Sequence, residues 1–148
     1  MIFPTVTGEN LEGQKLTFPA DFAGEKNIVF IPFERWHQND VDTWVPLVAQ
    51  LMQEQSTLRY YELPTLAPGN PLSRWFINSG MRSGIPDKGT RRVTVTLYIE
   101  KQPFCASLQI PDETKIHVFV VSRAGEVLWH TDGPLTEEKG QELRRAVG

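Results

Sequence analysis

The sequence contains a single cysteine, Cys105, among its 148 residues. One thiol cannot form a disulfide within the chain, so the cysteine content says nothing about an oxidising or reducing compartment. It also excludes a structural zinc site built from several cysteines. A Cys-x-x-Cys motif, the usual centre of dithiol chemistry, is excluded for the same reason.

The sequence also lacks any apolar run near the about 20 residues that a bilayer-spanning helix needs. Its first residues, Met1 to Thr5, have neither the basic end nor the apolar stretch of a signal peptide. The localisation therefore stays open: cytoplasmic, or mitochondrial or periplasmic if an upstream targeting segment has been removed. With a net charge of −3, we expect no nucleic-acid partner, whereas peripheral membrane contact stays open.

The hydrophobic content of 40% in 148 residues predicts one globular domain over residues 1–148. Strand and helix patterns alternate along the chain and end in a strand pair and a helix capped by Thr136. This order predicts an α/β sandwich with a mixed sheet. The expected elements are a hairpin around Gly13, strands at 27–33, 58–63, 93–99, 116–121 and 126–130, and helices at 39–53, 72–82, 103–108 and beyond Thr136.

The clearest helix pattern covers residues 39–53. Its apolar side chains, Trp44 among them, recur at helical spacing and predict one buried stripe. Asn39 is expected to cap the helix, and Asp40 and Asp42 suit its positive end. Pro46 lies well inside and removes one backbone hydrogen bond, so we expect a bend there.

The segment from Asn27 to Pro46 resembles the thioredoxin-like superfamily, and the resemblance extends over nearly the whole chain. A buried strand ends in Phe33 and is followed by a helix with an internal proline, Pro46. Aligned on these two residues without a gap, the family's two active-site cysteines fall on Gln38 and Val41. The family's cis-proline position falls on Ile116, nine residues before Gly125.

This resemblance implies a thioredoxin-like α/β/α sandwich with a mixed central sheet and an N-terminal β-hairpin. It also implies that the usual redox reaction is lost, because Gln38, Val41 and Ile116 replace the residues that carry it. We therefore expect a protein that is not an enzyme and needs no cofactor.

A narrower resemblance is to the mitochondrial ATP synthase assembly-factor family, thioredoxin-like proteins without the redox motif that assist incorporation of the proton-channel subunit a. It rests on Asn70-Pro71-Leu72 before the second predicted helix, on the run from Ile116 to Trp129, and on a basic loop. It implies a redox-inactive binding module or assembly chaperone, with an ATP synthase membrane subunit as a candidate protein partner. A bacterial relative with another partner stays open. The basic residues after the second predicted helix are Arg82, Lys88, Arg91 and Arg92.

The resemblance places the partner-binding residues on the face that holds the redox motif in relatives. These residues are Trp36, His37, Gln38, Ile116 and Trp75. An exposed tryptophan is a typical hot spot of a protein interface. The alternative for both tryptophans is core or rim packing, and the loop at 88–92 is either solvated or a contact for an acidic partner.

Two other functions stay open from the residues themselves. His37 and His117 fall on loops that meet in this fold, so they are candidates for a metal site with Asp40 or Asp42, or for a pH-sensitive pair. The alternative is a solvated His37 and a hydrogen-bonded His117. His130 is expected at the surface.

Cys105 is the basis of the other open function, a thiol enzyme with a single nucleophile. Lys101 lies at helical spacing from it and could favour the thiolate. The alternative is a small buried hydrophobic residue, because Cys105 lies on the apolar side of a short predicted helix.

Overall fold

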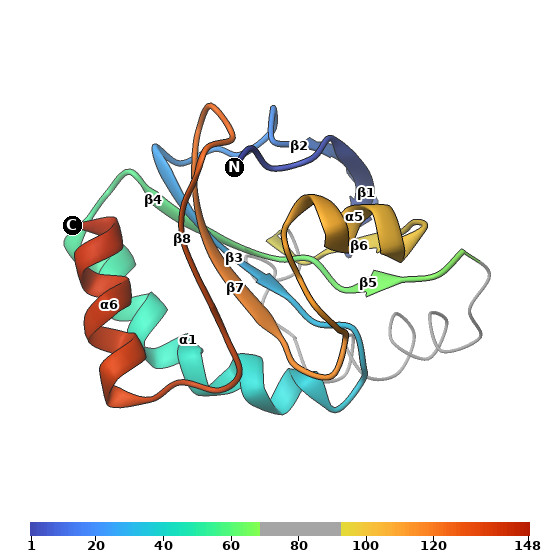
Figure 1. Cartoon of the computed structure of the whole chain (residues 1–148). Helices are drawn as coiled ribbons and strands as arrows, with labels where there is room; N and C mark the ends of the chain where they lie inside the picture. Colours follow the sequence, from blue (N-terminus) through green and yellow to red (C-terminus); the bar gives the residue numbers. More distant parts are fainter. Residues whose placement is uncertain (69–92) are drawn as a thin grey trace.

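The computed structural model describes residues 1–68 and 93–148. The predicted helix at 72–82 with Trp75, its Asn-Pro-Leu start, and the basic residues Arg82, Lys88, Arg91 and Arg92 lie outside them. Figure 1 shows the described elements in chain order. They are β1 (Val6–Asn10), β2 (Lys15–Phe18), β3 (Lys26–Ile31), α1 (His37–Glu54), β4 (Leu58–Glu62), β5 (Thr65–Leu66), β6 (Val95–Tyr98), α5 (Lys101–Ser107), β7 (His117–Ser122), β8 (Val127–Asp132) and α6 (Glu137–Val147).

The strands of the described residues form two four-stranded sheets. The central sheet has the order β4-β3-β7-β8, with β3 parallel to β4 and antiparallel to β7, so the predicted mixed central sheet is confirmed. The predicted N-terminal hairpin around Gly13 is β1 and β2, and its first strand lies further toward the N-terminus than the sequence pattern predicts. The hairpin belongs to the second sheet, in the order β2-β1-β6-β5.

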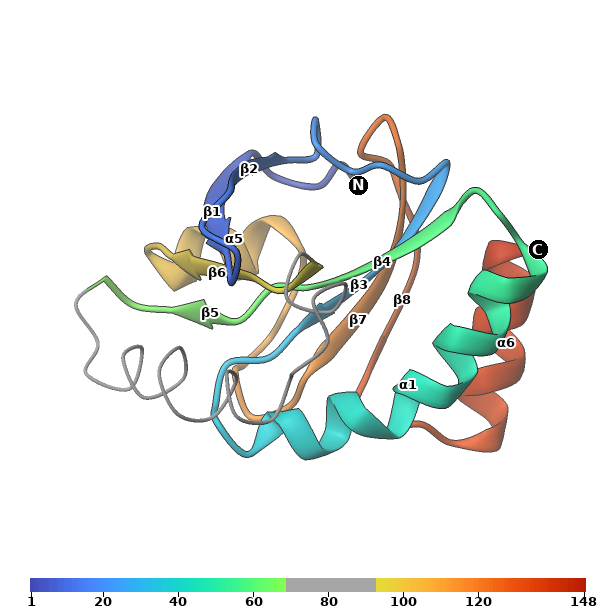
Figure 2. The same cartoon turned by 180° about the vertical axis from the view of Figure 1, so that it is seen from behind.

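The two central strands are buried on both faces, and their side chains alternate between two cores. Ile28 and Phe30 of β3 pack with α1 and α6, whereas Val29 and Ile31 pack under α5 and the hairpin. Figures 1 and 2 show α1 and α6 together on one side of the central sheet, with α5, β1 and β2 on the other. The alternation follows from the two-residue repeat of a strand, and it gives the predicted layered arrangement.

Helix α1 begins two residues earlier than the sequence pattern predicts. Trp36, not Asn39, is at the N-cap, and its side chain makes no capping hydrogen bond. The reason is that the chain is already turning: the amides of His37, Gln38 and Asn39 donate to carbonyls three residues back. Trp44 is fully buried and Pro46 lies inside the helix, as predicted. In the described residues, no helix has the length and hydrophobicity required to cross a membrane.

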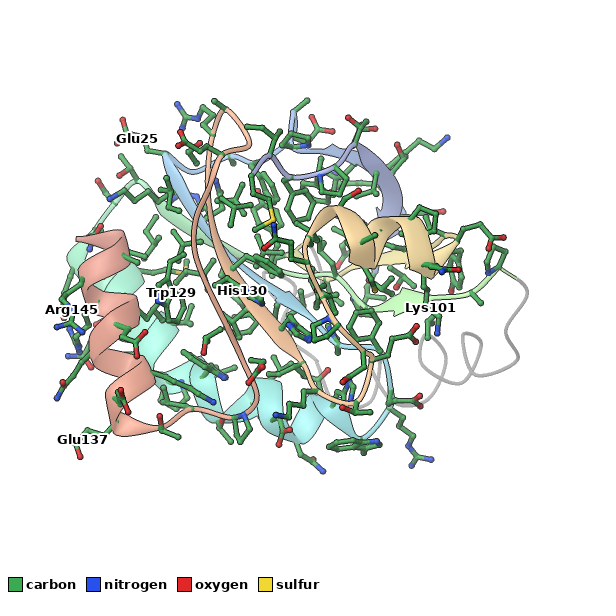
Figure 3. The ribbon with its side chains drawn as sticks, viewed as in Figure 1. Glu25, Lys101, Trp129, His130, Glu137 and Arg145 are labelled. Atoms are coloured by element: carbon green, nitrogen blue, oxygen red, sulfur yellow. The ribbon has the colours of Figure 1, made fainter. Side chains whose placement is uncertain are left out.

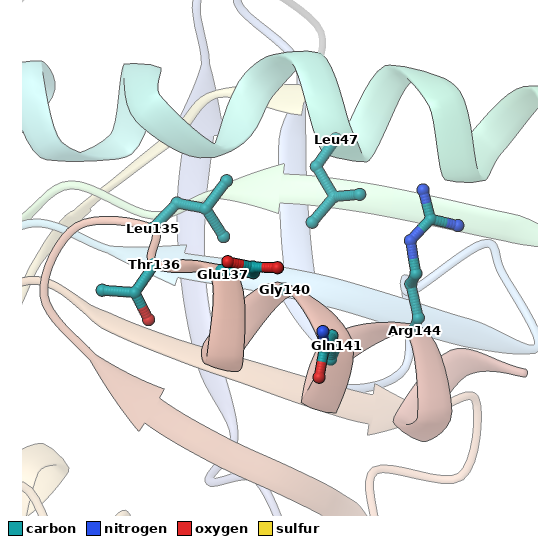
Figure 4. A pocket seen from close by; sticks show the side chains of 7 residues that line it. All are labelled: Leu47, Leu135, Thr136, Glu137, Gly140, Gln141 and Arg144. Atoms are coloured by element: carbon teal, nitrogen blue, oxygen red, sulfur yellow. The ribbon is translucent and has the colours of Figure 1, made fainter.

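Helix α6 packs beside α1 at a position where it carries a glycine. Figure 4 shows Leu47 of α1, Leu135 in the loop that precedes α6, and Gly140 of α6. These residues line a pocket of about 410 Å³ between the two helices. A Cβ at Gly140 would lie 3.4 Å from the ends of both leucine side chains. Thr136 caps α6 by accepting a hydrogen bond from the Lys139 amide, which confirms the predicted cap.

Gly8 of β1 has no room for a side chain, because the paired strand β6 lies directly against it. An added Cβ would meet the Thr96 carbonyl oxygen and lie 2.8 Å from a Leu97 methyl group. We expect Gly8→Ala to lower the free energy of unfolding by about 2 kcal/mol through overpacking. Gly140→Ala is the matched control: it should leave stability unchanged or raise it by up to about 1 kcal/mol, since alanine favours a helix interior. Urea denaturation measures both, and equal effects would contradict the predicted crowding at Gly8.

Candidate functional site

The start of α1 carries the candidate site, on the turn that follows β3. Trp36 is 54% exposed, although its neighbours Phe33 and His37 are buried. The Trp36 ring stands edge-on against the His37 ring, with the ring centroids 4.3 Å apart. Of the two alternatives that the sequence leaves open for Trp36, exposure and packing in the core or its rim, the structure shows exposure.

His37 uses both ring nitrogens on the protein backbone. Its Nδ1 accepts hydrogen bonds from the amides of Phe33, at 2.9 Å, and Glu34, at 3.2 Å. Its Nε2 lies 3.3 Å from the carbonyl oxygen of Thr114, which can only accept. The ring is therefore neutral, with its proton on Nε2, and it joins the loop before α1 to the loop before β7. Burial lowers the pKa of His37, in agreement with a neutral ring.

Two of the predicted partner-binding residues, His37 and Ile116, are fully buried. Their side chains cannot form part of an exposed surface, so this part of the prediction is corrected. His37 is buried because it bonds inward to the backbone, and Ile116 because it packs in the core beside α1. Ile116 follows a trans peptide bond; the cis bond in the described residues precedes Pro19. The turn at Gly125 is present, with φ of 92°.

Gln38 lies at the predicted position of the first cysteine and bridges two carboxylates. Its amide nitrogen donates to Asp42, at 3.0 Å, and to Glu62 at the end of β4, at 3.3 Å. The Thr94 hydroxyl donates to the other Glu62 oxygen at 3.2 Å. Asp42 is thus engaged by Gln38, and Asp40 remains as the acidic residue in the first turn of α1.

Glu62 is 3% exposed, which is unusual for a carboxyl group. Desolvation raises its pKa, and the hydrogen bonds from Gln38 and Thr94 oppose that rise. Burial prevails, so the group holds its proton to a higher pH than a solvated glutamate. Glu62 is not among the residues that the sequence patterns predict for the site. The available signal was its place at the end of a strand parallel to β3, because the carboxyl ends of parallel strands meet at one edge of a sheet.

His117 pairs with His130 and not with His37. The His117 Nδ1 and His130 Nε2 atoms are 3.0 Å apart, and burial together with the charge of His130 lowers the pKa of His117 to about 4. The Phe33 ring makes edge contacts with both His37 and His117. Since both His37 nitrogens are engaged, the expected metal pair does not form. Within residues 1–68 and 93–148, no group of three His, Cys, Asp or Glu side chains could hold a metal ion.

His130 is half-buried instead of exposed, which corrects the expectation for it. Its ring stacks on Phe119 with the centroids 4.3 Å apart, and burial lowers its pKa. Figure 3 shows Trp129 and His130 on β8, where Trp129 donates a hydrogen bond to Glu142 of α6. Successive side chains of a strand point to opposite faces, so His130 turns toward the other core.

Cys105 lies in α5, in the core on the opposite side of the central sheet from α1. It is 8% exposed, and desolvation, with a smaller effect of Glu113, raises the pKa of its thiol. Lys101 opposes the rise, but it forms an ion pair with Glu113. Of the two predictions for Cys105, a reactive thiol and a small buried hydrophobic residue, the structure confirms the burial.

Comparisons with known proteins show what this fold resembles. No family model matches the chain, and no curated protein matches it. A thiol:disulfide interchange protein of the thioredoxin family from Chlorobium tepidum TLS matches with a TM-score of 0.60 and 15% identity, over 100% of this chain and 97% of that one. A thiol-disulfide oxidoreductase from Bacteroides fragilis matches with 0.62 and 11%, over 98% of both chains.

BsSco, a member of the Sco family of cytochrome c oxidase assembly proteins, matches with a TM-score of 0.62 and 13% identity, over 98% of this chain and 92% of that one. Together these structures show that the chain has the thioredoxin-like fold. The predicted fold class is therefore confirmed.

Glu62→Gln tests the buried carboxyl group. Glutamine resembles the protonated side chain, so it removes the free energy needed to ionise Glu62 inside the protein. A raised pKa means that wild-type stability falls as pH rises above 4.5, the ordinary value, through the folded-state pKa. We therefore expect the stability of Glu62→Gln relative to wild type to grow from pH 4.5 toward pH 8. Urea denaturation at several pH values measures it, and a constant difference would contradict the raised pKa.

Cys105 provides a second test, through its rate of reaction with a thiol reagent. Because it is buried and its pKa is raised, the native thiol should react at least about 100-fold more slowly than the unfolded chain at pH 8. Measurement of absorbance with an aromatic disulfide reagent, with and without urea, gives both rates. Equal rates would return the thiol-enzyme hypothesis to consideration.

Proposed function

We propose that this thioredoxin-like domain is a redox-inactive binding module or assembly chaperone that holds a partner protein at the start of α1. One observation carries the proposal. Gln38, at the position predicted for the first redox cysteine, is hydrogen-bonded to two carboxylates, whereas Trp36 two residues before it is 54% exposed. The position of the chemistry holds an unreactive amide, and the neighbouring contact residue remains available.

The chemistry of the side chains supports a role without thiol exchange. Disulfide exchange needs a thiolate as the nucleophile, and an amide cannot replace it. The one thiol of the sequence, Cys105, is buried in the other core with a raised pKa. A thiolate at the position of Gln38 would also lie near the Asp42 carboxylate, which disfavours another negative charge.

The surface around Trp36 suits a particular kind of partner segment. Trp36 offers a large apolar face, and two acidic side chains in the same segment are exposed: Glu34, two residues before it, and Asp42, in the second turn of α1. An apolar segment flanked by basic residues would bury the ring and pair with these charges. Tryptophan is also the aromatic side chain that attracts a cation most strongly.

We further propose an ATP synthase membrane subunit as the partner. The basis is the resemblance of the sequence to the mitochondrial assembly-factor family. BsSco, which shares the fold, belongs to a family of cytochrome c oxidase assembly proteins, so an assembly role occurs on this architecture. That support is analogy at the level of the fold.

Affinity capture from detergent-solubilised native cells tests the proposal, with partners identified by mass spectrometry. We expect wild type to enrich an ATP synthase membrane subunit and Trp36→Ala to lose it. Truncation of a hot-spot residue costs about 2 kcal/mol of binding, or roughly 30-fold in affinity. Exposed substitutions change stability by about 0.5 kcal/mol or less, so the melting temperature should hardly move.

Leu128→Ala is the matched control for this experiment. Leu128 is 43% exposed and apolar, but it lies near the β7–β8 turn, at the other end of β7 from Thr114. It should capture the same proteins as wild type. Identical sets of proteins from wild type and Trp36→Ala would contradict the proposed binding site. A partner lost with Trp36→Ala that is not an ATP synthase subunit would retain the site and reject the proposed partner.

A further inference from the structure

We propose that His37 is the positioning residue of the Trp36 surface: in its neutral form, protonated on Nε2, it ties the loop before α1 to Thr114 and holds Trp36 in the binding position. The partner-binding part of this inference rests on the proposed function. The hydrogen bonds of His37 to Phe33, Glu34 and Thr114, here called the clamp, are a property of the free protein and can be tested without a partner.

Three hydrogen bonds form the clamp. The amides of Phe33 and Glu34 donate to His37 Nδ1, and His37 Nε2 donates to the carbonyl of Thr114, 77 residues away in sequence. Phe33 is buried, so the His37 ring supplies the hydrogen bond that the Phe33 amide would otherwise make with water. An unpaired buried donor is costly, and the ring therefore fixes the turn from Phe33 to His37 in one conformation.

The same ring supports Trp36. The edge-on contact between the two rings, with centroids 4.3 Å apart, places the buried imidazole beneath an indole that is half exposed. Trp36 is also the N-cap residue of α1, without a capping hydrogen bond from its side chain. Loss of the imidazole from its place would therefore remove a contact of the indole and loosen the backbone that carries it.

The far end of the clamp is itself held in place. The Asp112 carboxylate accepts hydrogen bonds from the Thr114 amide, at 3.0 Å, and from the Thr114 hydroxyl. These bonds shape the loop so that the Thr114 carbonyl meets His37. The hydrogen bonds from Thr114, and to a smaller extent the charge of Lys115, lower the pKa of Asp112 and so keep it ionised.

Protonation would break the clamp on its Nδ1 side. An imidazolium carries hydrogens on both nitrogens, so Nδ1 would point a proton at two amide donors. The groups that face His37 oppose each other: the carboxylates of Glu34 and Asp40 and the Thr114 carbonyl favour the cation, whereas burial disfavours it. Burial is the largest effect, so the pKa lies below the ordinary 6.5. His117, on the other side of Phe33, is neutral down to about pH 4.

The stability that the clamp contributes should fall as the pH falls. A histidine with a lowered pKa contributes stability above pH 6.5, and that contribution is lost as pH falls through the folded-state pKa. The clamp is therefore closed at neutral pH and opens on acidification.

Two variants separate the nitrogens of the ring. His37→Asn places an amide oxygen near the Nδ1 position, so it keeps an acceptor for the two amides and cannot titrate. His37→Gln places an amide nitrogen near the Nε2 position and removes the Nδ1 acceptor. His130→Gln is the control, because it removes a titrating histidine on β8 without touching the clamp.

NMR on the free protein is the decisive measurement. Ring nitrogen shifts at pH 7.5 should show the Nε2–H form of His37. In wild type and His130→Gln, the hydrogen-exchange protection of the Phe33 and Glu34 amides should fall about tenfold or more, and the Trp36 indole signal should shift, as pH drops below 6.5. In His37→Asn both should stay constant over that range, and in His37→Gln protection should be low throughout.

A proton on Nδ1 at pH 7.5, or a pH profile of His37→Asn equal to that of wild type, would overturn the clamp. Affinity capture at pH 7.5 then tests the link to binding. His37→Gln should lose the partner as Trp36→Ala does, whereas His37→Asn should capture less partner than wild type and more than His37→Gln, because it keeps the Nδ1 acceptor but neither the ring contact with Trp36 nor the bond to Thr114. Because the NMR readouts involve no partner, failure of the clamp and failure of the proposed binding function are told apart.

Discussion

In the central sheet, β3 and β7 pair antiparallel with Ile31 opposite His117, and the site at the start of α1 depends on that register. Both strands are buried on both faces, so a slip of one residue would turn every apolar side chain into the wrong core. The register ends with the chain before α1 next to the chain before β7. The bond between His37 and Thr114 is possible because of this neighbourhood.

Three polar side chains near this point, His37, His117 and Glu62, are buried, and each is held by hydrogen bonds. His37 is an uncharged ring between backbone groups, His117 is paired with His130, and Glu62 receives hydrogen bonds from Gln38 and Thr94. Low dielectric makes unpaired polar groups costly, so such networks keep one geometry. Rigid surroundings of this kind suit a surface that must present Trp36 in a fixed position.

The arrangement differs in chemical purpose from a dithiol site on the same fold. A redox site needs an accessible thiolate stabilised by positive charge, whereas Gln38 here is neutral and lies between two carboxyl groups. The sulfur that the chain does have is on the other side of the central sheet. What the start of α1 retains is its position at the edge of the sheet and an exposed aromatic side chain.

Much of the architecture was determined by sequence alone. Two-residue alternation, the helical stripe containing Trp44 and the Thr136 cap are local patterns, and local sterics and hydrogen bonding decide them. The resemblance to the thioredoxin-like superfamily also placed the candidate site at Gln38, because that alignment depends on the spacing between Phe33 and Pro46. The burial of Cys105 followed from its apolar neighbours in a short helix.

Only the tertiary structure decided which polar side chains meet. His117 faces His130 because β7 and β8 pair, and His37 turns inward because two amides and a distant carbonyl surround it. Glu62 becomes a site residue because β4 ends beside α1. The contacts of His117 with His130, of Gln38 with Glu62 and of His37 with Thr114 join residues 13 to 77 positions apart. Sequence patterns report the period of one element, whereas such contacts depend on how separate elements are packed, so the burial of His37 and Ile116 could not be read from the chain.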